Sequence, residues 1–142
     1  MNKKYVNTII IIFFVFFVTG FSKISFSLDN TLKKFEWEKR ILLIIAKSEN
    51  EKIILETKKF FEKYTCGNNE RNLKLITVIT SKIETLKIPK KFRNRYGILL
   101  IGYDGKEKAY SKDSSLLNQL HNIIDSMPIR LSEMIGNKSK CN

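Results

Sequence analysis

The stretch RILLIIA at Arg40–Ala46 constrains the fold more than any other part of this 142-residue chain. After its first residue the stretch is wholly apolar, and the polar turn Lys47–Asn50 and a segment of helical periodicity follow it. A buried parallel strand that leads into its crossover helix has this pattern, because both faces of such a strand are covered. The turn contains no cysteine, histidine or glycine-rich loop, so it offers no nucleophile, metal ligand or phosphate cradle.

Apolar residues at helical spacing predict a first helix over Glu49–Tyr64. Ser48 and Glu51 form an S-x-x-E capping box for its start, and Gly67 supplies its stop. The other expected elements are strands at Leu73–Thr80, Gly97–Tyr103 and Lys106–Tyr110, a short helix from Pro89 to Tyr96, and a last helix from Asp113 or Ser114 to Met127.

This order of elements, with Asp104-Gly105 as the hairpin turn, predicts a thioredoxin-like α/β fold. Such a fold is a mixed sheet with helices on both faces. Before the first strand, Leu28–Lys39 is expected to be an extended lead-in, in which Phe35 and Trp37 lie on one side and cover an edge of the core.

The N-terminus has the pattern of an export signal. Lys3 and Lys4 precede the apolar run Ile9–Val18, and Ser25-Phe26-Ser27 places small residues where a signal peptidase reads them. The sequence therefore predicts a signal peptide at 1–27, one domain at 28–136 and a flexible tail at 137–142, in a periplasmic or secreted protein. The alternative is an uncleaved segment that anchors the protein in the inner membrane and is its only membrane contact, although Thr19-Gly20 shortens the apolar run below the roughly 20 residues that a span needs.

The formal net charge of +12 favours anionic partners, although codon bias and solubility also explain an excess of lysine. The densest basic stretch is KIPKKFRNR at Lys87–Arg95, which has five basic residues and no acid. On a short helix Phe92 would point inward, and the predicted binding surface is the outward set Lys90, Lys91, Arg93 and Arg95. Its expected partner is an envelope protein or an anionic polymer, not nucleic acid; a merely solvated helix is the competing explanation.

Four stretches resemble a known family in their order and spacing. They are FEWEKRILLIIA at Phe35–Ala46, NERNL at Asn69–Leu73, GILLIGYDGKEK at Gly97–Lys108 and IIDSMPIRLSEM at Ile123–Met134. They are similar to the bacterial family called domain of unknown function 4174, and Asp125–Arg130 is the most specific match. Asn72 departs from the more usual ERDL, which has aspartate at that position. The resemblance implies an exported thioredoxin-like domain, like those of secreted animal sushi-repeat proteins, and it implies no catalytic residue.

An alignment of the strand ends with thioredoxin shows what the chain lacks. The redox dithiol would fall within Ser48–Lys52 and the cis-proline at Gly97, and this sequence has neither. Without a thiolate at a helix N-terminus, no nucleophile of low pKa is available there for disulfide exchange or peroxide reduction. No metal site or cofactor is expected.

Cys66 and Cys141 are the only cysteines. In an oxidising compartment they can form a structural disulfide, which would close a loop of about 75 residues and contribute up to about 4 kcal/mol. Two unpaired thiols are the alternative. His121, the only histidine, is expected at the edge of the last helix's apolar stripe, and a lone histidine does not build a metal site.

Two functions remain open. The first is a non-catalytic binding module, which the missing dithiol and the basic stretch favour. The alternative is a thiol-dependent oxidoreductase or peroxidase-like enzyme that uses Cys66, with or without Cys141. The sequence disfavours it, because thiolate activation needs a helix N-terminus and Cys66 is expected near a helix C-terminus.

The signal prediction has a direct test. Mass spectrometry of the mature protein is expected to give an N-terminus at Leu28, because cleavage after Ser27 satisfies the small-residue rule. A protein that begins at Met1 or Asn2 and remains in the membrane fraction would contradict it.

Overall fold

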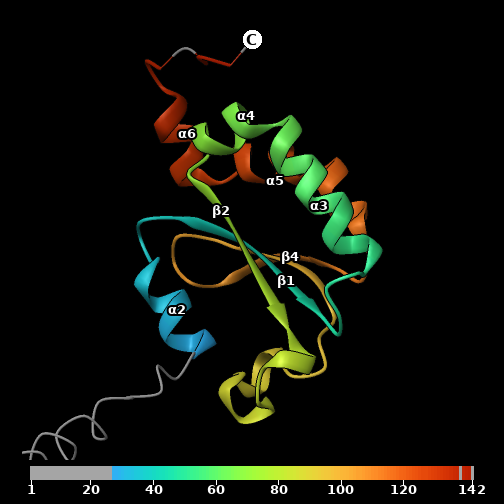
Figure 1. Cartoon of the computed structure of the whole chain (residues 1–142). Helices are drawn as coiled ribbons and strands as arrows, with labels where there is room; N and C mark the ends of the chain where they lie inside the picture. The colour runs from blue at the N-terminus through green and yellow to red at the C-terminus, as the bar shows by residue number, and fades with distance from the viewer. Residues whose placement is uncertain (1–26, 138, 142) are drawn as a thin grey trace, which may run out of the picture.

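A computed structural model gives the fold and describes residues 27–137 and 139–141. The chain forms an α/β fold in which helices cover a four-stranded mixed sheet (Figure 1). The strands are β1 (Arg40–Ala46), β2 (Leu73–Ile79), β3 (Gly97–Ile101) and β4 (Glu107–Ser111). The α-helices of the described residues are α2 (Leu28–Lys34), α3 (Lys52–Lys63), α4 (Thr65–Glu70), α5 (Leu120–Asp125) and α6 (Pro128–Met134).

The sheet has the order β2-β1-β3-β4, with β1 at its centre. β1 pairs in parallel with β2, and antiparallel with β3, which in turn pairs antiparallel with β4. All seven residues of β1 are buried. The central strand predicted at Arg40–Ala46 is therefore confirmed in its bounds and its burial.

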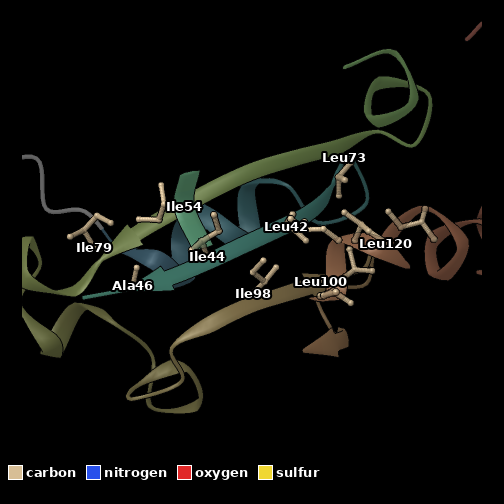
Figure 2. Close-up of a cluster of buried hydrophobic side chains, with 12 residues drawn as sticks. Leu42, Ile44, Ala46, Ile54, Leu73, Ile79, Ile98, Leu100 and Leu120 are labelled. Atoms are coloured by element: carbon tan, nitrogen blue, oxygen red, sulfur yellow. The ribbon is translucent and has the colours of Figure 1, made fainter. Parts of the chain in front are cut away.

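Alternate side chains of β1 build two separate cores, one on each face of the sheet. Leu42, Ile44 and Ala46 pack with residues of α3 and α5 (Figure 2). Ile41, Leu43 and Ile45 pack on the opposite face with residues of α2 and of the segment before β3. Figure 1 accordingly shows α2 apart from the group formed by α3 to α6. The strand reads as a continuous apolar run because both of its faces are covered.

The lead-in predicted as extended at Leu28–Lys39 is wrong, since α2 occupies its first part. Leu28 and Leu32, four residues apart, are both buried, and this helical spacing outweighs the alternation of Phe35 and Trp37. Phe35 packs against the core, whereas Trp37 has a φ of 63° and is 69% exposed.

The predicted signal at 1–27 lies outside the described residues, except for Ser27. Ser27 is the N-cap of α2: its hydroxyl accepts from Asn30 N–H, and its carbonyl accepts from Thr31 N–H and Thr31 Oγ1. Cleavage after Ser27 would remove this cap from α2. Among the described residues, no helix is both long enough and apolar enough to cross a membrane.

The capping prediction for the first helix is correct only in part. The helix begins at Lys52 with Glu51 as its N-cap, and Ser48 does not cap it. The predicted reach of Glu51 back to Ser48 is confirmed: its carboxylate accepts from the backbone N–H groups of Lys47 and Ser48, over 2.6 and 3.1 Å. Gly67 does not stop the helix, because the chain turns at Tyr64 and Gly67 lies within α4.

Two other predicted helices are shorter or divided. The short helix at Pro89–Tyr96 is wrong: the segment holds a 3₁₀ turn, η3 (Lys90–Phe92), although Ile88 and Phe92 are buried as predicted. It is preceded by η1 (Thr80–Lys82) and η2 (Thr85–Lys87). The last helix is divided into η4 (Ser114–Asn118), α5 and α6, with Asp113 capping η4 as predicted and Pro128 beginning α6.

The start of β3 gives a stability prediction. Gly97 has a φ of 134°, and a Cβ at this position would lie 2.2 Å from the carbonyl oxygen of Ser111 on the paired strand. We expect Gly97→Ala to lower the free energy of unfolding by about 3 kcal/mol, from backbone strain and this collision. Gly136→Ala is the matched control, because Gly136 also has a positive φ but a Cβ added there would meet no atom within 4 Å, so only about 1 kcal/mol of strain is expected. Urea denaturation measures both; equal losses would contradict the prediction.

Candidate functional site

Arg40, the first residue of β1, is a buried arginine with only 1% of its surface exposed. Its guanidinium donates to both carboxylate oxygens of Glu133 on α6, over 3.2 and 3.3 Å, and to the carbonyl of Arg71 over 2.9 Å. It also lies 4.1 Å from the centre of the Tyr103 ring. A buried charge is tolerated only when it is paired, so these contacts hold α6 and the α4–β2 connection against the start of β1.

Two further arginines join this pair through Asp125, the last residue of α5. Arg71 donates to one oxygen of Asp125, and Arg130 donates to the other over 3.1 Å. Arg130 also donates to Glu133 over 3.4 Å and to the carbonyl of Glu70 over 2.9 Å. We call these three arginines and two acids, Arg40, Arg71, Arg130, Asp125 and Glu133, the arginine network. It has three guanidinium groups and two carboxylates.

Asn72 connects the network to the hairpin. It has a φ of 48°, a left-handed conformation that asparagine adopts more readily than most residues. Its amide donates to the hydroxyl of Tyr103 over 2.9 Å, and its carbonyl oxygen accepts from Lys39 over 3.3 Å. Asn72 therefore adds hydrogen bonds to the site and no negative charge.

The arginines keep both acids ionised. Burial by itself raises the pKa of Glu133, but the hydrogen bonds and charge of Arg40 outweigh it and hold that pKa below its ordinary value of 4.5. Burial likewise raises the pKa of Asp125, but the hydrogen bonds and charges of Arg71 and Arg130 outweigh it and bring that pKa below the ordinary 3.8. Both carboxylates are thus charged at neutral pH.

A pocket of about 830 Å³ opens beside the network. Its walls come from the end of α3, from α4, α5 and α6, and from the C-terminal tail. The charged residues that line it are Lys63, Glu70, Arg71, Asp125, Arg130, Glu133 and Lys140. Asn72 also lines it, and the buried Arg40, which is not part of the lining, donates to Glu133.

The C-terminal tail is attached to α4 at two points. Cys66 of α4 and Cys141 form a disulfide, one of the two states that the sequence left open. Glu70 accepts hydrogen bonds from Ser139 Oγ and from the backbone N–H of Lys140. The N–H of Lys140, followed by Ser139, holds the pKa of Glu70 below its ordinary value.

The sequence pattern that resembles a family converges on this network. Each of the four stretches contributes: Arg40, Arg71 and Tyr103 come from the first three, and the fourth supplies Asp125, Arg130 and Glu133. The family model described as Domain of unknown function (DUF4174) matches residues 31–133. The chain belongs to this family. No curated protein and no solved structure matches the chain. Residues from all four stretches thus meet in space at one end of the sheet.

His121 lies beside the pocket, at the boundary where the sequence predicted it. Its Nε2 is 2.8 Å from Oδ1 of Asn68, and its ring stacks edge-on against Phe60 and Tyr64. Burial, and then the charge of Arg71, lower the pKa of His121, so the ring is neutral at pH 7. His121 is therefore part of the pocket wall, held by ring packing and one hydrogen bond.

The structure places the predicted binding residues of the basic stretch outside this pocket's lining. Lys90 and Lys91 are exposed, with Lys91 over the Phe92 ring. Arg93 donates to the carbonyl of Ile88, and Arg95 forms a two-point ion pair with Glu107 over 2.5 and 3.0 Å. Two of the four side chains therefore already have partners within the DUF4174 domain.

Cys66 lies just past the end of the first helix, α3, as the sequence predicts. It is also the second residue of the next helix, α4, which the sequence analysis did not expect. Cys66, Glu70 and Cys141 have their possible metal-ligand atoms within 4.8 Å of one another. Because both sulfurs are in the disulfide, neither is a thiolate that could bind a metal.

The arginine network itself was missed at the level of sequence. The charges of Arg40 and Glu133 looked like ordinary strand-end and helix-surface charges, and 93 residues separate them. The sequence did contain one signal. Arg130 and Glu133 are three residues apart and therefore share one face of a helix, whereas Ile129 and Leu131 lie on other faces. In the structure the apolar pair is exposed and Arg130 is buried.

The network predicts a large cost for removing Arg40. Arg40→Met leaves Glu133 and the Arg71 carbonyl without their principal donors, so we expect the free energy of unfolding to fall by about 3 to 5 kcal/mol. Arg95→Met is the matched control. It breaks a two-point ion pair that is partly exposed, so the free energy of unfolding should fall by only about 1 kcal/mol. Denaturant unfolding of both variants measures the difference, and similar losses would show that Arg40 is not a central pairing residue.

The same network predicts the direction of acid sensitivity. Because the folded pKa values of Asp125 and Glu133 are depressed, their contribution to stability is complete above the unfolded values of 3.8 and 4.5 and is lost as the pH falls through the folded values. Thermal melts between pH 7 and pH 2.5 are expected to show this decline. With Arg40→Met the decline should become shallower, because Glu133 loses the cation that lowers its pKa; an unchanged acid profile would be evidence against this pairing.

Proposed function

We propose that this protein is an exported, non-catalytic binding module with a thioredoxin-like sheet, which holds an anionic group of an envelope protein or polymer in the pocket beside the arginine network. The observation that carries the proposal is the charge of this pocket. Lys63, Arg71, Arg130 and Lys140 line it together with three acids, one of which, Glu133, also accepts from the buried Arg40. Four cations of the lining thus face three carboxylates.

The three acids are already engaged, which leaves the positive charge in excess. Asp125 and Glu133 are each shared between two arginines, and Glu70 accepts from the tail. The Nε of Arg71 is buried and has no hydrogen-bond partner within the described part of the chain. A partly enclosed site of this kind strengthens the attraction for an anion compared with open water.

Guanidinium groups suit such a ligand for geometric reasons. Their planar fork matches a carboxylate or phosphate with two parallel hydrogen bonds, and they are weakly hydrated. In this protein Arg71 and Arg130 are fixed by Asp125, so little conformational entropy would be lost when they engage a ligand. A phosphate or carboxylate group of a larger molecule is therefore the ligand class.

The sheet supports the thioredoxin-like part of the proposal. Its order β2-β1-β3-β4, with β1 parallel to β2 and antiparallel to β3, agrees with the order and directions expected for that fold. The turn after β1 carries Ser48 and Glu51 where thioredoxin has its dithiol, and Glu51 is engaged with the backbone there. These observations favour binding over thiol chemistry at that position.

The disulfide supports export. Bridges such as Cys66–Cys141 persist in oxidising compartments and are rare where thiols are kept reduced. The predicted signal and the disulfide are independent features that agree on a periplasmic or secreted protein. The inner-membrane alternative, with an uncleaved N-terminal segment, places the same domain in the same compartment.

A second candidate function rests on the same disulfide. Cys66 is exposed and stands near the start of α4, so an oxidoreductase that exchanges this bond with a substrate thiol is the alternative. It predicts disulfide reduction or peroxide consumption that Cys66→Ser abolishes. Activity that persists in Cys66→Ser, or none in the native protein, removes this candidate.

Two asparagines allow a matched test of the binding proposal. Asn72 lines the pocket and Asn94 lies in the basic stretch, and both have left-handed backbones. Inorganic phosphate, the smallest probe, is titrated into each variant while NMR chemical shifts report binding. We expect Asn72→Asp to raise the Kd about tenfold, equivalent to about 1.4 kcal/mol, by adding a carboxylate to the pocket without changing its shape. Asn94→Asp should leave the Kd unchanged.

The reverse result would place the anion on the basic stretch of Lys90, Lys91, Arg93 and Arg95 and overturn the pocket proposal. In that case charge reversal of Lys90 and Lys91 would abolish binding. Absence of phosphate binding in the native protein would also overturn the proposal. Unfolding midpoints of both variants serve as the control for altered folding.

A further inference from the structure

The tail residues Ser139–Cys141 form one wall of the pocket. All three line it, and their described contacts to the domain are the disulfide to Cys66 and the hydrogen bonds to Glu70. Neither sheet core includes a tail residue. The wall is therefore held by one covalent bond and by hydrogen bonds to a single carboxylate.

The attached tail changes the charge of the pocket in two ways. It brings the cation Lys140 to the rim. It also occupies the carboxylate of Glu70 with donors from Ser139 and Lys140, close enough to Arg130 for their charges to interact. Release of the tail would remove one cation and leave one unengaged carboxylate beside the arginines.

We propose that the Cys66–Cys141 disulfide is a redox switch, and that its reduction by an external dithiol releases the tail and weakens anion binding in the pocket. This inference rests on the proposed function, because it concerns regulation of the same site. The oxidised protein is the binding form. The pocket is open to solvent in that form. The tail does not close it and forms one of its charged walls.

The chemistry of the switch balances with one dithiol. A thiolate of the reductant attacks Sγ of Cys66, the S–S bond breaks, and the sulfur of Cys141 leaves and takes a proton. The second thiol of the reductant then attacks the mixed disulfide, so that Cys66 leaves as the second thiol. Two electrons and two protons pass to the protein, and the dithiol becomes a disulfide. Cys66 is the exposed partner, which favours attack there.

The hydrogen bonds to Glu70 are too few to hold the tail once the disulfide is open. They lie at a partly exposed carboxylate, where water competes for the same donors. The disulfide joins residues 75 apart in sequence, so its loss frees the tail while both sheet cores remain intact. Binding and reduction are coupled reciprocally: an anion that prefers the oxidised form makes the disulfide harder to reduce by the same factor.

The experiment compares oxidised protein, protein reduced with dithiothreitol, and Cys141→Ser, with inorganic phosphate as the probe and NMR shifts as the readout. We expect the Kd for phosphate to rise about tenfold on reduction and to the same extent in Cys141→Ser without reductant. Amide shifts of the core strands should stay unchanged.

Glu70→Gln should lessen the effect of reduction on the Kd to about threefold, because release of the tail then leaves no unpaired carboxylate in the pocket. Glu62→Gln, an exposed acid on α3, should leave the effect of reduction at its full size.

A second readout follows the tail without any ligand. The pKa of Glu70, measured by NMR in the oxidised and reduced protein, should rise toward its ordinary value of 4.5 on reduction, because the Lys140 N–H and Ser139 are released. An unchanged pKa would overturn the switch. Equal phosphate affinities before and after reduction would overturn the switch while leaving the binding proposal intact, whereas no phosphate binding in the oxidised protein would overturn both.

Discussion

The pairing of Arg40 with Glu133 is the interaction on which the remaining structure at this end of the sheet depends. Arg40 begins the central strand, and a charge buried to this degree is unfavourable without a partner. The partner comes from α6, 93 residues later in the chain, so the last helix has to lie at the start of β1. This requirement also explains why α6 turns its polar face inward and leaves Ile129 and Leu131 exposed.

The pocket is a consequence of this arrangement. Once α6 is held by Arg40, Arg130 reaches Asp125 and the carbonyl at the end of α4, and the helices enclose a charged hollow between them. Three of the four stretches that resemble the family supply the members of this network, and the remaining one supplies Tyr103, whose ring lies against Arg40. The candidate site therefore lies at the end of the sheet where β1 begins, whereas the segment Ser48–Lys52 follows the opposite end of β1.

Strands could be predicted from the sequence more reliably than helices, for a physical reason. β1, β2 and the hairpin strands are defined by local runs of apolar residues and by Asp104-Gly105, and each was placed within a few residues. Helix ends depend on which hydrogen bonds compete locally. Glu51 accepts from Ser48 N–H as predicted, but Glu51 and not Ser48 is the N-cap of α3. Leu28 with Leu32 forms a helix where Phe35 and Trp37 suggested an extended segment.

The sequence by itself determined the α/β class, the buried central strand, the family and the absence of a thioredoxin dithiol, because each depends on residue type and short-range spacing. Only the tertiary structure decided that Arg40 and Glu133 meet, that Cys66 and Cys141 join, and that the cations gather around one pocket. Charged residues carry no periodic signal for their distant partners. Their pairing follows from the cost of burying a charge, which exists only once the chain has folded.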